Sequence, residues 1–178
     1  MKIVLWIVGI IVVLVLGFLL YMGAFSPVKV SQEKVQPFFM AYEDYVGEYK
    51  NVMPVFEKVN KHLISKGIKP TKGVGVYLDD PKTVAKDKLR SMIGYMITDA
   101  DIKTLKPFAK EFKIQKVMFD KAIVAEFPLK NQLSILLGIT KVYPTMSKYL
   151  VANKLKGGPV AEIYDMNINK IIYVMQLL

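Results

Sequence analysis

The sequence predicts an α+β protein: an N-terminal transmembrane helix, then a duplicated β-α-β-β unit forming one antiparallel sheet with both helices on one face. Two observations support this prediction. An apolar run without charges lies close to the N-terminus, and the order strand, helix, strand, strand occurs twice in the rest of the chain. Units of this kind bury the apolar side of a sheet under their helices.

The apolar run covers residues 3–22, twenty positions without a charged side chain. At about 1.5 Å per residue, such a helix crosses a hydrocarbon core of about 30 Å. Trp6 and Tyr21 lie near its ends, where amphipathic rings favour the headgroup level. A cleaved signal peptide is the alternative, but bulky Met22 does not suit a small-x-small cleavage site before Phe25. We therefore expect an uncleaved single-pass anchor over residues 1–23, in a bacterial cell membrane, and a juxtamembrane linker over residues 24–34.

Residues 35–178 are expected to form one domain of two repeats, the first over about 35–98 and the second over about 112–178. In each repeat an aromatic or alternating strand precedes a helix with apolar residues at helical spacing, and two further strands follow. Pro54 and Pro144 fall at the same position when the two helices are aligned, and Phe56 then matches Met146. The predicted strands cover residues 37–45, 73–78, 91–97, 121–127, 160–164 and 170–175, and the helices about 52–63 and 136–155.

Composition excludes several classes of function. The chain has no Cys, so it forms no disulfide and uses neither thiol catalysis nor Cys-ligated zinc. Its one His, His62, lies among lysines on a predicted helix, and we expect an exposed residue and no metal site. The net charge of +10 comes from lysines spread singly along the chain, which indicates an anionic lipid surface as partner and no nucleic acid.

Two stretches resemble the GyrI-like family of effector-binding domains, which is related to the SOUL haem-binding proteins. They are residues 77–81 leading into 89–94, and residues 158–164. The likeness covers about Val35 to the C-terminus, and an anchor followed by this domain is similar to membrane-anchored relatives of the testis-expressed ER-phagy receptor. The resemblance implies the duplicated fold and a small-molecule site with no cofactor; activity does not follow from fold alone.

Glu162 is the strongest candidate site residue, because it lies in the middle of an otherwise apolar strand. Alternation puts Glu162 and Tyr164 on one face and Ala161 and Ile163 on the other. If the second pair packs under the helices, Glu162 faces a groove on the open side of the sheet. A carboxylate there suits a cationic or aromatic ligand, with ring faces from tyrosines of this and other strands. The expected ligand-binding residues are Glu162, Tyr164, Tyr77, Tyr95 and Tyr173.

Three classes of function fit these expectations. The first is a membrane-tethered module that binds a small molecule. The second is a membrane-anchored interaction domain whose groove is filled, with Glu162 only a solvent-facing strand residue. The third is a hydrolase in which Glu162 acts as general base and Tyr164 orients it. Asp79 and Asp80, next to Pro81, are expected to start a turn, with Arg90 paired to one of them.

Overall fold

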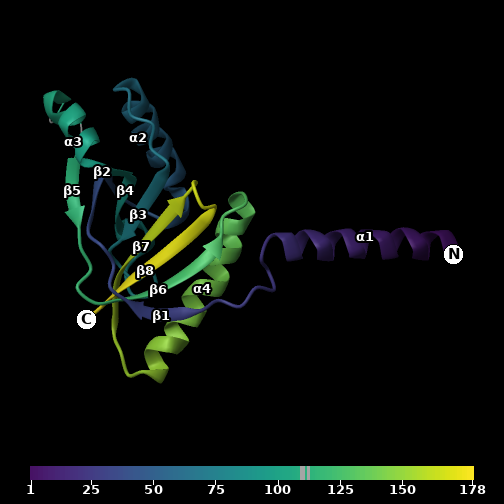
Figure 1. Cartoon of the computed structure of the whole chain (residues 1–178). Helices are drawn as coiled ribbons and strands as arrows, with labels where there is room; N and C mark the ends of the chain where they lie inside the picture. The colour runs from purple at the N-terminus through teal and green to yellow at the C-terminus, as the bar shows by residue number, and fades with distance from the viewer. Residues whose placement is uncertain (109–110, 112) are drawn as a thin grey trace.

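The computed structural model describes residues 1–108, 111 and 113–178 (Figure 1). An isolated N-terminal helix precedes a single sheet with further helices packed against it. The helices are α1 (Lys2–Tyr21), α2 (Met53–Ser65), α3 (Asp99–Leu105) and α4 (Gln132–Ala152). The strands are β1 (Val30–Glu33), β2 (Phe38–Val46), β3 (Lys72–Tyr77), β4 (Arg90–Ile97), β5 (Lys113–Val117), β6 (Ala122–Pro128), β7 (Gly157–Asp165) and β8 (Lys170–Leu177).

The strand order of the sheet confirms the duplicated fold. All eight strands pair antiparallel in the order β1-β6-β8-β7-β3-β4-β2-β5. The first unit is β2-α2-β3-β4 and the second is β6-α4-β7-β8. Their strands occur in reversed order on the two sides of the sheet, and the units meet where β3 pairs with β7. Two short strands extend the edges: β5 pairs with β2, and β1 pairs with β6. Strand β1 lies within the segment 24–34 that the sequence suggests as a linker.

Both large helices cover the same face of the sheet, as predicted. On α2, the Phe56 ring meets the Tyr164 ring edge-on with centroids 5.8 Å apart. On α4, the Tyr143 hydroxyl reaches the Glu162 carboxylate. Glu162 and Tyr164 are alternate residues of β7 and therefore project from one face. Phe56 and Met146 are both buried, as the alignment of the two helices predicts.

The opposite face of the sheet does not form the open groove that we expected. It carries a buried apolar cluster to which the sheet strands contribute, including Ala161 and Ile163. Phe38 near the start of β2 and Phe119 in the connection from β5 to β6 complete this cluster. Twisted sheets curve, so side chains from the edges can cover the middle of a face without a helix. This side of the molecule is thus a second core layer.

Helix α4 begins earlier than its apolar spacing predicts. Asn131 caps it, because its Oδ1 accepts hydrogen bonds from the backbone N–H groups of Leu133 at 2.9 Å and Ser134 at 3.2 Å. Ser134 Oγ in turn accepts from the backbone N–H of Asn131 at 3.1 Å, which completes a capping box.

The two prolines that align in the sequence occupy different positions in their helices. Pro54 lies in the first turn of α2, whereas Pro144 lies inside α4.

Helix α1 is long and apolar enough to cross a membrane, judged by length and composition. None of its residues is buried against the domain. Met22, directly after the helix, is fully buried, so the chain meets the domain at once where α1 ends. Figure 1 shows α1 projecting away from the sheet next to the N-terminal end of α4.

Candidate functional site

Glu162 lies at the centre of the sheet, on the face that the helices cover. It occupies β7 opposite Gly75 of β3 and Tyr173 of β8, and only 3% of it is exposed. The sequence-based assignment of faces was therefore wrong: Ala161 and Ile163 pack on the other side. Alternation fixes which residues share a face, but it does not say which face the helices cover. Glu162 thus lies where the two repeats meet, between α2 and α4.

Two tyrosine hydroxyls hold the Glu162 carboxylate. Tyr143 of α4 donates to Oε1 at 2.7 Å, and Tyr164 of β7 donates to Oε2. Within residues 1–108, 111 and 113–178, no Lys or Arg forms an ion pair with this carboxylate. A buried carboxylate normally has a cationic partner, since desolvation of an unpaired charge is costly.

Two further tyrosines complete the surroundings of this carboxylate. The Tyr77 hydroxyl neighbours that of Tyr164, and the fully buried Tyr173 lies opposite Glu162 on β8. Two glycines leave space for these tyrosine side chains. A Cβ at Gly75 would come within 2.8 Å of the Tyr77 hydroxyl, and a Cβ at Gly138 would collide with the Tyr173 hydroxyl. We call the five residues Glu162, Tyr77, Tyr143, Tyr164 and Tyr173 the Glu162 cluster.

The cluster is electrostatically unusual. Burial raises the pKa of Glu162, and the hydrogen bonds from Tyr164 and Tyr143 offset part of that rise. Burial, and after it the nearby Glu162 charge, also holds the pKa of Tyr143 and Tyr164 well above the ordinary tyrosine value. Every hydroxyl therefore stays protonated and can donate a hydrogen bond at neutral pH. The cluster presents one carboxyl group surrounded by aromatic rings and hydroxyl donors.

The structure brings together four of the five predicted ligand-binding residues. Tyr95 is the exception, because the Phe56 ring lies between it and Tyr164, 5.9 Å from the Tyr95 centroid. Sequence reasoning did not name Tyr143 as a site residue. One turn of helix separates Tyr143 from buried Met146, and this spacing was the available signal.

The Tyr173 hydroxyl is buried, and none of the described residues forms a hydrogen bond with it. An unsatisfied buried polar group costs about 1–3 kcal/mol. Tyr173→Phe is therefore expected to leave the free energy of unfolding unchanged or to raise it by about 1 kcal/mol, as measured by urea denaturation. Tyr143→Phe serves as the contrast, because it removes a hydroxyl that does have a partner and should destabilise the domain. A loss of stability in Tyr173→Phe as large as in Tyr143→Phe would contradict this assignment.

The acidic pair after β3 has a structural role, as expected. Arg90 donates to both carboxylate oxygens of Asp79, at 3.0 Å from Nε and 2.7 Å from Nη2. Asp80 Oδ1 accepts from the backbone N–H of Lys82 at 2.9 Å and so forms a turn. His62 lies on α2 with its Nε2 atom 2.8 Å from a Glu111 carboxylate oxygen.

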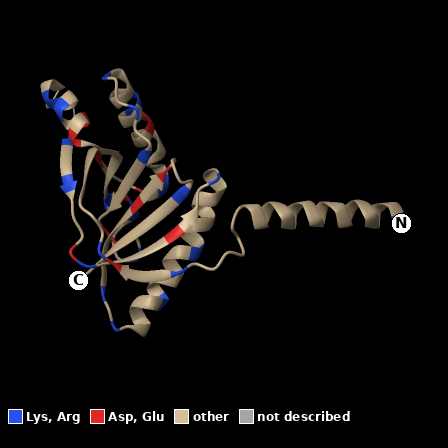
Figure 2. Cartoon of the chain, viewed as in Figure 1, with Lys and Arg blue, Asp and Glu red and all other residues tan. Residues whose placement is uncertain are grey.

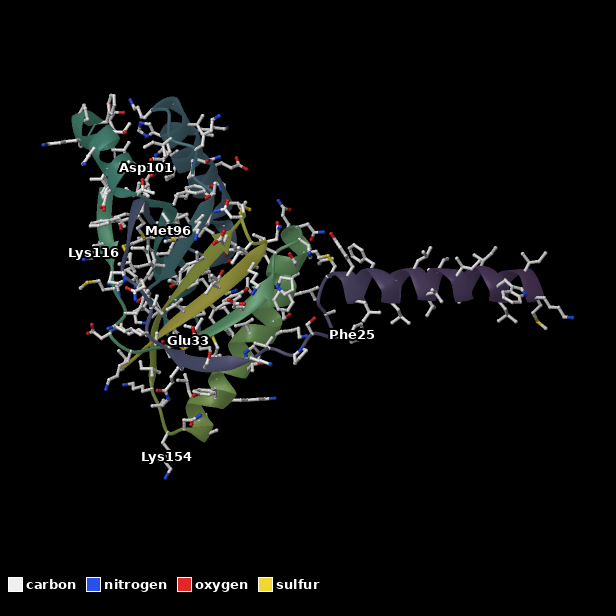
Figure 3. The ribbon with its side chains drawn as sticks, viewed as in Figure 1. Phe25, Glu33, Met96, Asp101, Lys116 and Lys154 are labelled. Carbon is white, nitrogen blue, oxygen red and sulfur yellow. The ribbon has the colours of Figure 1, made fainter. Side chains whose placement is uncertain are left out.

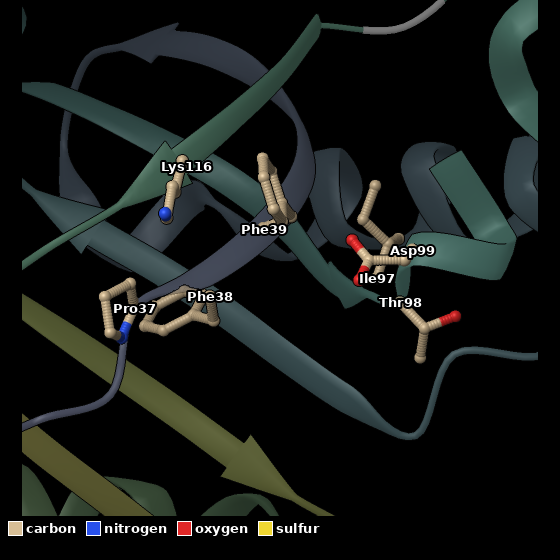
Figure 4. Close-up of a pocket in the computed structure, with 7 residues that line it drawn as sticks. All are labelled: Pro37, Phe38, Phe39, Ile97, Thr98, Asp99 and Lys116. Atoms are coloured by element: carbon tan, nitrogen blue, oxygen red, sulfur yellow. The ribbon is translucent and has the colours of Figure 1, made fainter. Parts of the chain in front are cut away.

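Two surface depressions lie away from the Glu162 cluster. One, at the edge formed by β2, β4 and β5, is shown in Figure 4. It is lined by Pro37, Phe38, Phe39, Ile97, Thr98, Asp99 and Lys116. The other lies beside the turn between β7 and β8 and includes Lys130 and Ile168. Neither includes a member of the Glu162 cluster, whose tyrosine side chains fill the space next to the carboxylate.

Curated relatives with similar sequences are testis-expressed proteins. The chain is 27% identical over 156 residues to the testis-expressed protein 264 homolog of Mus musculus, covering 83% of this chain and 48% of that protein. It is 27% identical over 159 residues to testis-expressed protein 264 of Homo sapiens, covering 84% and 49%. The chain thus spans about half the length of the curated relatives it matches.

Solved structures with the same fold include an integron cassette protein of Vibrio cholerae, with a TM-score of 0.57, 10% identity and coverage of 84% of this chain and 95% of that one. The C-terminal domain of EcmrR gives a TM-score of 0.55 at 7% identity, covering 84% and 96%. SAV2435, solved with bound tetraphenylphosphonium, gives 0.53 at 14% identity, covering 84% and 92%. At these identities the likeness is one of fold.

The sequence also matches a family over most of its length. Residues 29–173 fit the family described as the GyrI-like small molecule binding domain. This range contains the whole first β-α-β-β unit, the second unit as far as Tyr173 in β8, and the whole Glu162 cluster. The chain therefore belongs to the GyrI-like small-molecule-binding domain family.

Proposed function

We propose that this protein is a membrane-tethered module that binds a small organic cation at the Glu162 cluster. The observation that carries the proposal is the buried Glu162 carboxylate, which accepts hydrogen bonds from tyrosine hydroxyls and, among the described residues, forms no ion pair with a Lys or Arg. A bound cation would supply the missing charge partner. The tyrosine rings would add cation–π contacts, which strengthen when water is excluded.

Ligand entry requires a side chain to move, because the cluster is filled. Tyr143 is the best candidate for this movement. It is only partly buried, and it comes from α4, whereas Glu162 and the other tyrosines of the cluster come from the sheet. Pro144 follows it inside the helix, where a proline removes one backbone hydrogen bond and weakens the helix locally. We propose that Tyr143 swings away from Glu162 and lets the ligand enter between α4 and α2.

The ligand of one structural neighbour provides a probe. SAV2435 was solved with tetraphenylphosphonium, an apolar organic cation. A ligand that binds only the folded state raises the unfolding temperature with its concentration. In a thermal-shift series on the full chain in lipid nanodiscs, tetraphenylphosphonium should raise this temperature, whereas neutral triphenylphosphine oxide should not. Equal shifts would indicate aromatic recognition without a role for charge.

The main alternative is a membrane-anchored interaction domain. The observation in its favour is that tyrosine side chains fill the space at Glu162, so that the cluster acts as a polar part of the core. Under this alternative no organic cation shifts the unfolding temperature. A hydrolase with Glu162 as base and Tyr164 as its orienting group would also need a water next to the carboxylate, and would show turnover of an added substrate.

A further inference from the structure

The end of α1 is fastened to the domain by one lysine of α4. Lys141 Nζ donates to the backbone carbonyls of Ala24 and Ser26, both at 2.6 Å, and to that of Gly23 at 3.4 Å. These carbonyls directly follow the C-terminus of α1, where a cation is favoured. Buried Met22 contacts Asn131 through its sulfur, 3.6 Å from Nδ2. The first three turns of α4 are thus held beside the chain that leaves α1.

The same part of α4 exposes an apolar stripe. Leu133, Leu136 and Ile139 are 42%, 57% and 39% exposed, while the buried side of these turns carries Ser134 and Gly138. Phe25, between α1 and the domain, is 60% exposed and points away from the sheet (Figure 3). Large exposed apolar side chains of this kind mark a surface that a membrane or a partner protein covers.

Helix α4 and the residues that flank it in the sequence carry charge of one sign. The sequence from residue 127 to residue 161 contains no Asp or Glu but five lysines: Lys130, Lys141, Lys148, Lys154 and Lys156. Residues 22–32 also lack an acidic residue. Figure 2 shows α4 with basic and no acidic residues. Lys130 Nζ lies 5.3 Å from the centroid of the Tyr21 ring, at the last residue of α1. Apolar residues with flanking lysines are typical of helices that lie on anionic bilayers.

The geometry points to a membrane-docking face made of Leu133, Leu136, Ile139 and Phe25. If α1 spans the bilayer, Met22 lies at the boundary of the hydrocarbon core. The headgroup layer beyond that boundary is about 5–8 Å thick on each side. Leu133 and Ile139 are separated by about 9 Å along α4, and the contacts of Asn131 and Lys141 hold this stretch next to Met22 and Ser26. The stripe therefore lies at headgroup depth, with Lys130 beside the end of α1.

This inference rests on α1 remaining as an anchor, which is part of the proposed function, but it does not depend on ligand binding at Glu162. The absence of Cys makes a direct test simple, because one introduced cysteine carries one fluorescent probe. The full chain is reconstituted in vesicles of phosphatidylcholine and phosphatidylglycerol that also contain a nitroxide-labelled lipid. Quenching with the nitroxide at the headgroup or deep in the acyl chain then reports the depth of each probe.

Probes at Leu133→Cys and Leu136→Cys should be quenched by the headgroup nitroxide and lie within the outer ~10 Å of the bilayer. Val13→Cys, in the middle of α1, should be quenched by the deep nitroxide. Val151→Cys is the matched control, because it is 80% exposed on the same helix but about 27 Å from Leu133 along its axis, and it should stay unquenched. If Val13 is quenched and the two leucine positions are not, or if Val151 is quenched equally, the docking face is wrong. An unquenched Val13 would overturn the anchor and the docking face together.

Discussion

Glu162→Gln is expected to stabilise the folded domain increasingly as pH rises. Burial raises the folded-state pKa of Glu162 above its unfolded value. The folded state therefore holds the proton more tightly than the unfolded state does. The stability that this provides is complete below the unfolded pKa and is lost as pH rises through the folded pKa. Within that window the wild type loses up to about 1.4 kcal/mol per pH unit relative to a variant without the titration.

Thermal unfolding of both proteins between about pH 4 and about pH 9 measures this difference. The gap in unfolding temperature should open in favour of Glu162→Gln as pH rises, by a few degrees per kcal/mol. Glu126→Gln is the matched control, since Glu126 lies on β6 with an exposed side chain that pairs with Lys170 at 2.5 Å. Parallel pH profiles for the wild type and Glu162→Gln would mean that the carboxylate is not desolvated.

Phe56→Ala is expected to cost about 3–5 kcal/mol in the free energy of unfolding. The ring is 7% exposed and meets Tyr95 and Tyr164 edge-on, at 5.9 Å and 5.8 Å between centroids. Truncation removes both ring contacts and leaves a cavity under α2, next to the Glu162 cluster. Urea denaturation measures the loss.

Met53→Ala is a suitable comparison for Phe56→Ala, because Met53 lies on the same helix and is 44% exposed. Its truncation should cost well under 1 kcal/mol, in the range of ordinary surface changes. If Phe56→Ala costs no more than Met53→Ala, α2 does not pack on the sheet through Phe56.

The sequence predicts the strands and helices of the duplicated units well, because their apolar spacing reflects burial directly. The edge strands β1 and β5 were missed. They are four and five residues long, with burial on few positions, so alternation leaves little signal. Helix α3 was missed for the same reason, since only Leu105 of its seven residues is buried.

The site illustrates a different limit. Alternation correctly paired Glu162 with Tyr164, but it could not tell which face of β7 the helices cover. That depends on the sheet's curvature and on side chains such as Phe119, which lie far from β7 in the sequence. Tyr143 and Tyr95 show the same limit: a tyrosine in an apolar segment is recognisable, but its distance from Glu162 depends on how α2 and α4 pack together.

We propose that Glu162 binds the charge of an organic cation. Isothermal titration of the full chain in nanodiscs with tetraphenylphosphonium tests it, with empty nanodiscs as the blank for lipid partitioning. The wild type and Glu126→Gln should bind alike. Glu162→Gln should bind more weakly by about 1–3 kcal/mol, or roughly 5–150-fold in Kd, because a charge-assisted contact becomes neutral. Equal affinity of Glu162→Gln and the wild type, or no binding by the wild type, would contradict the account.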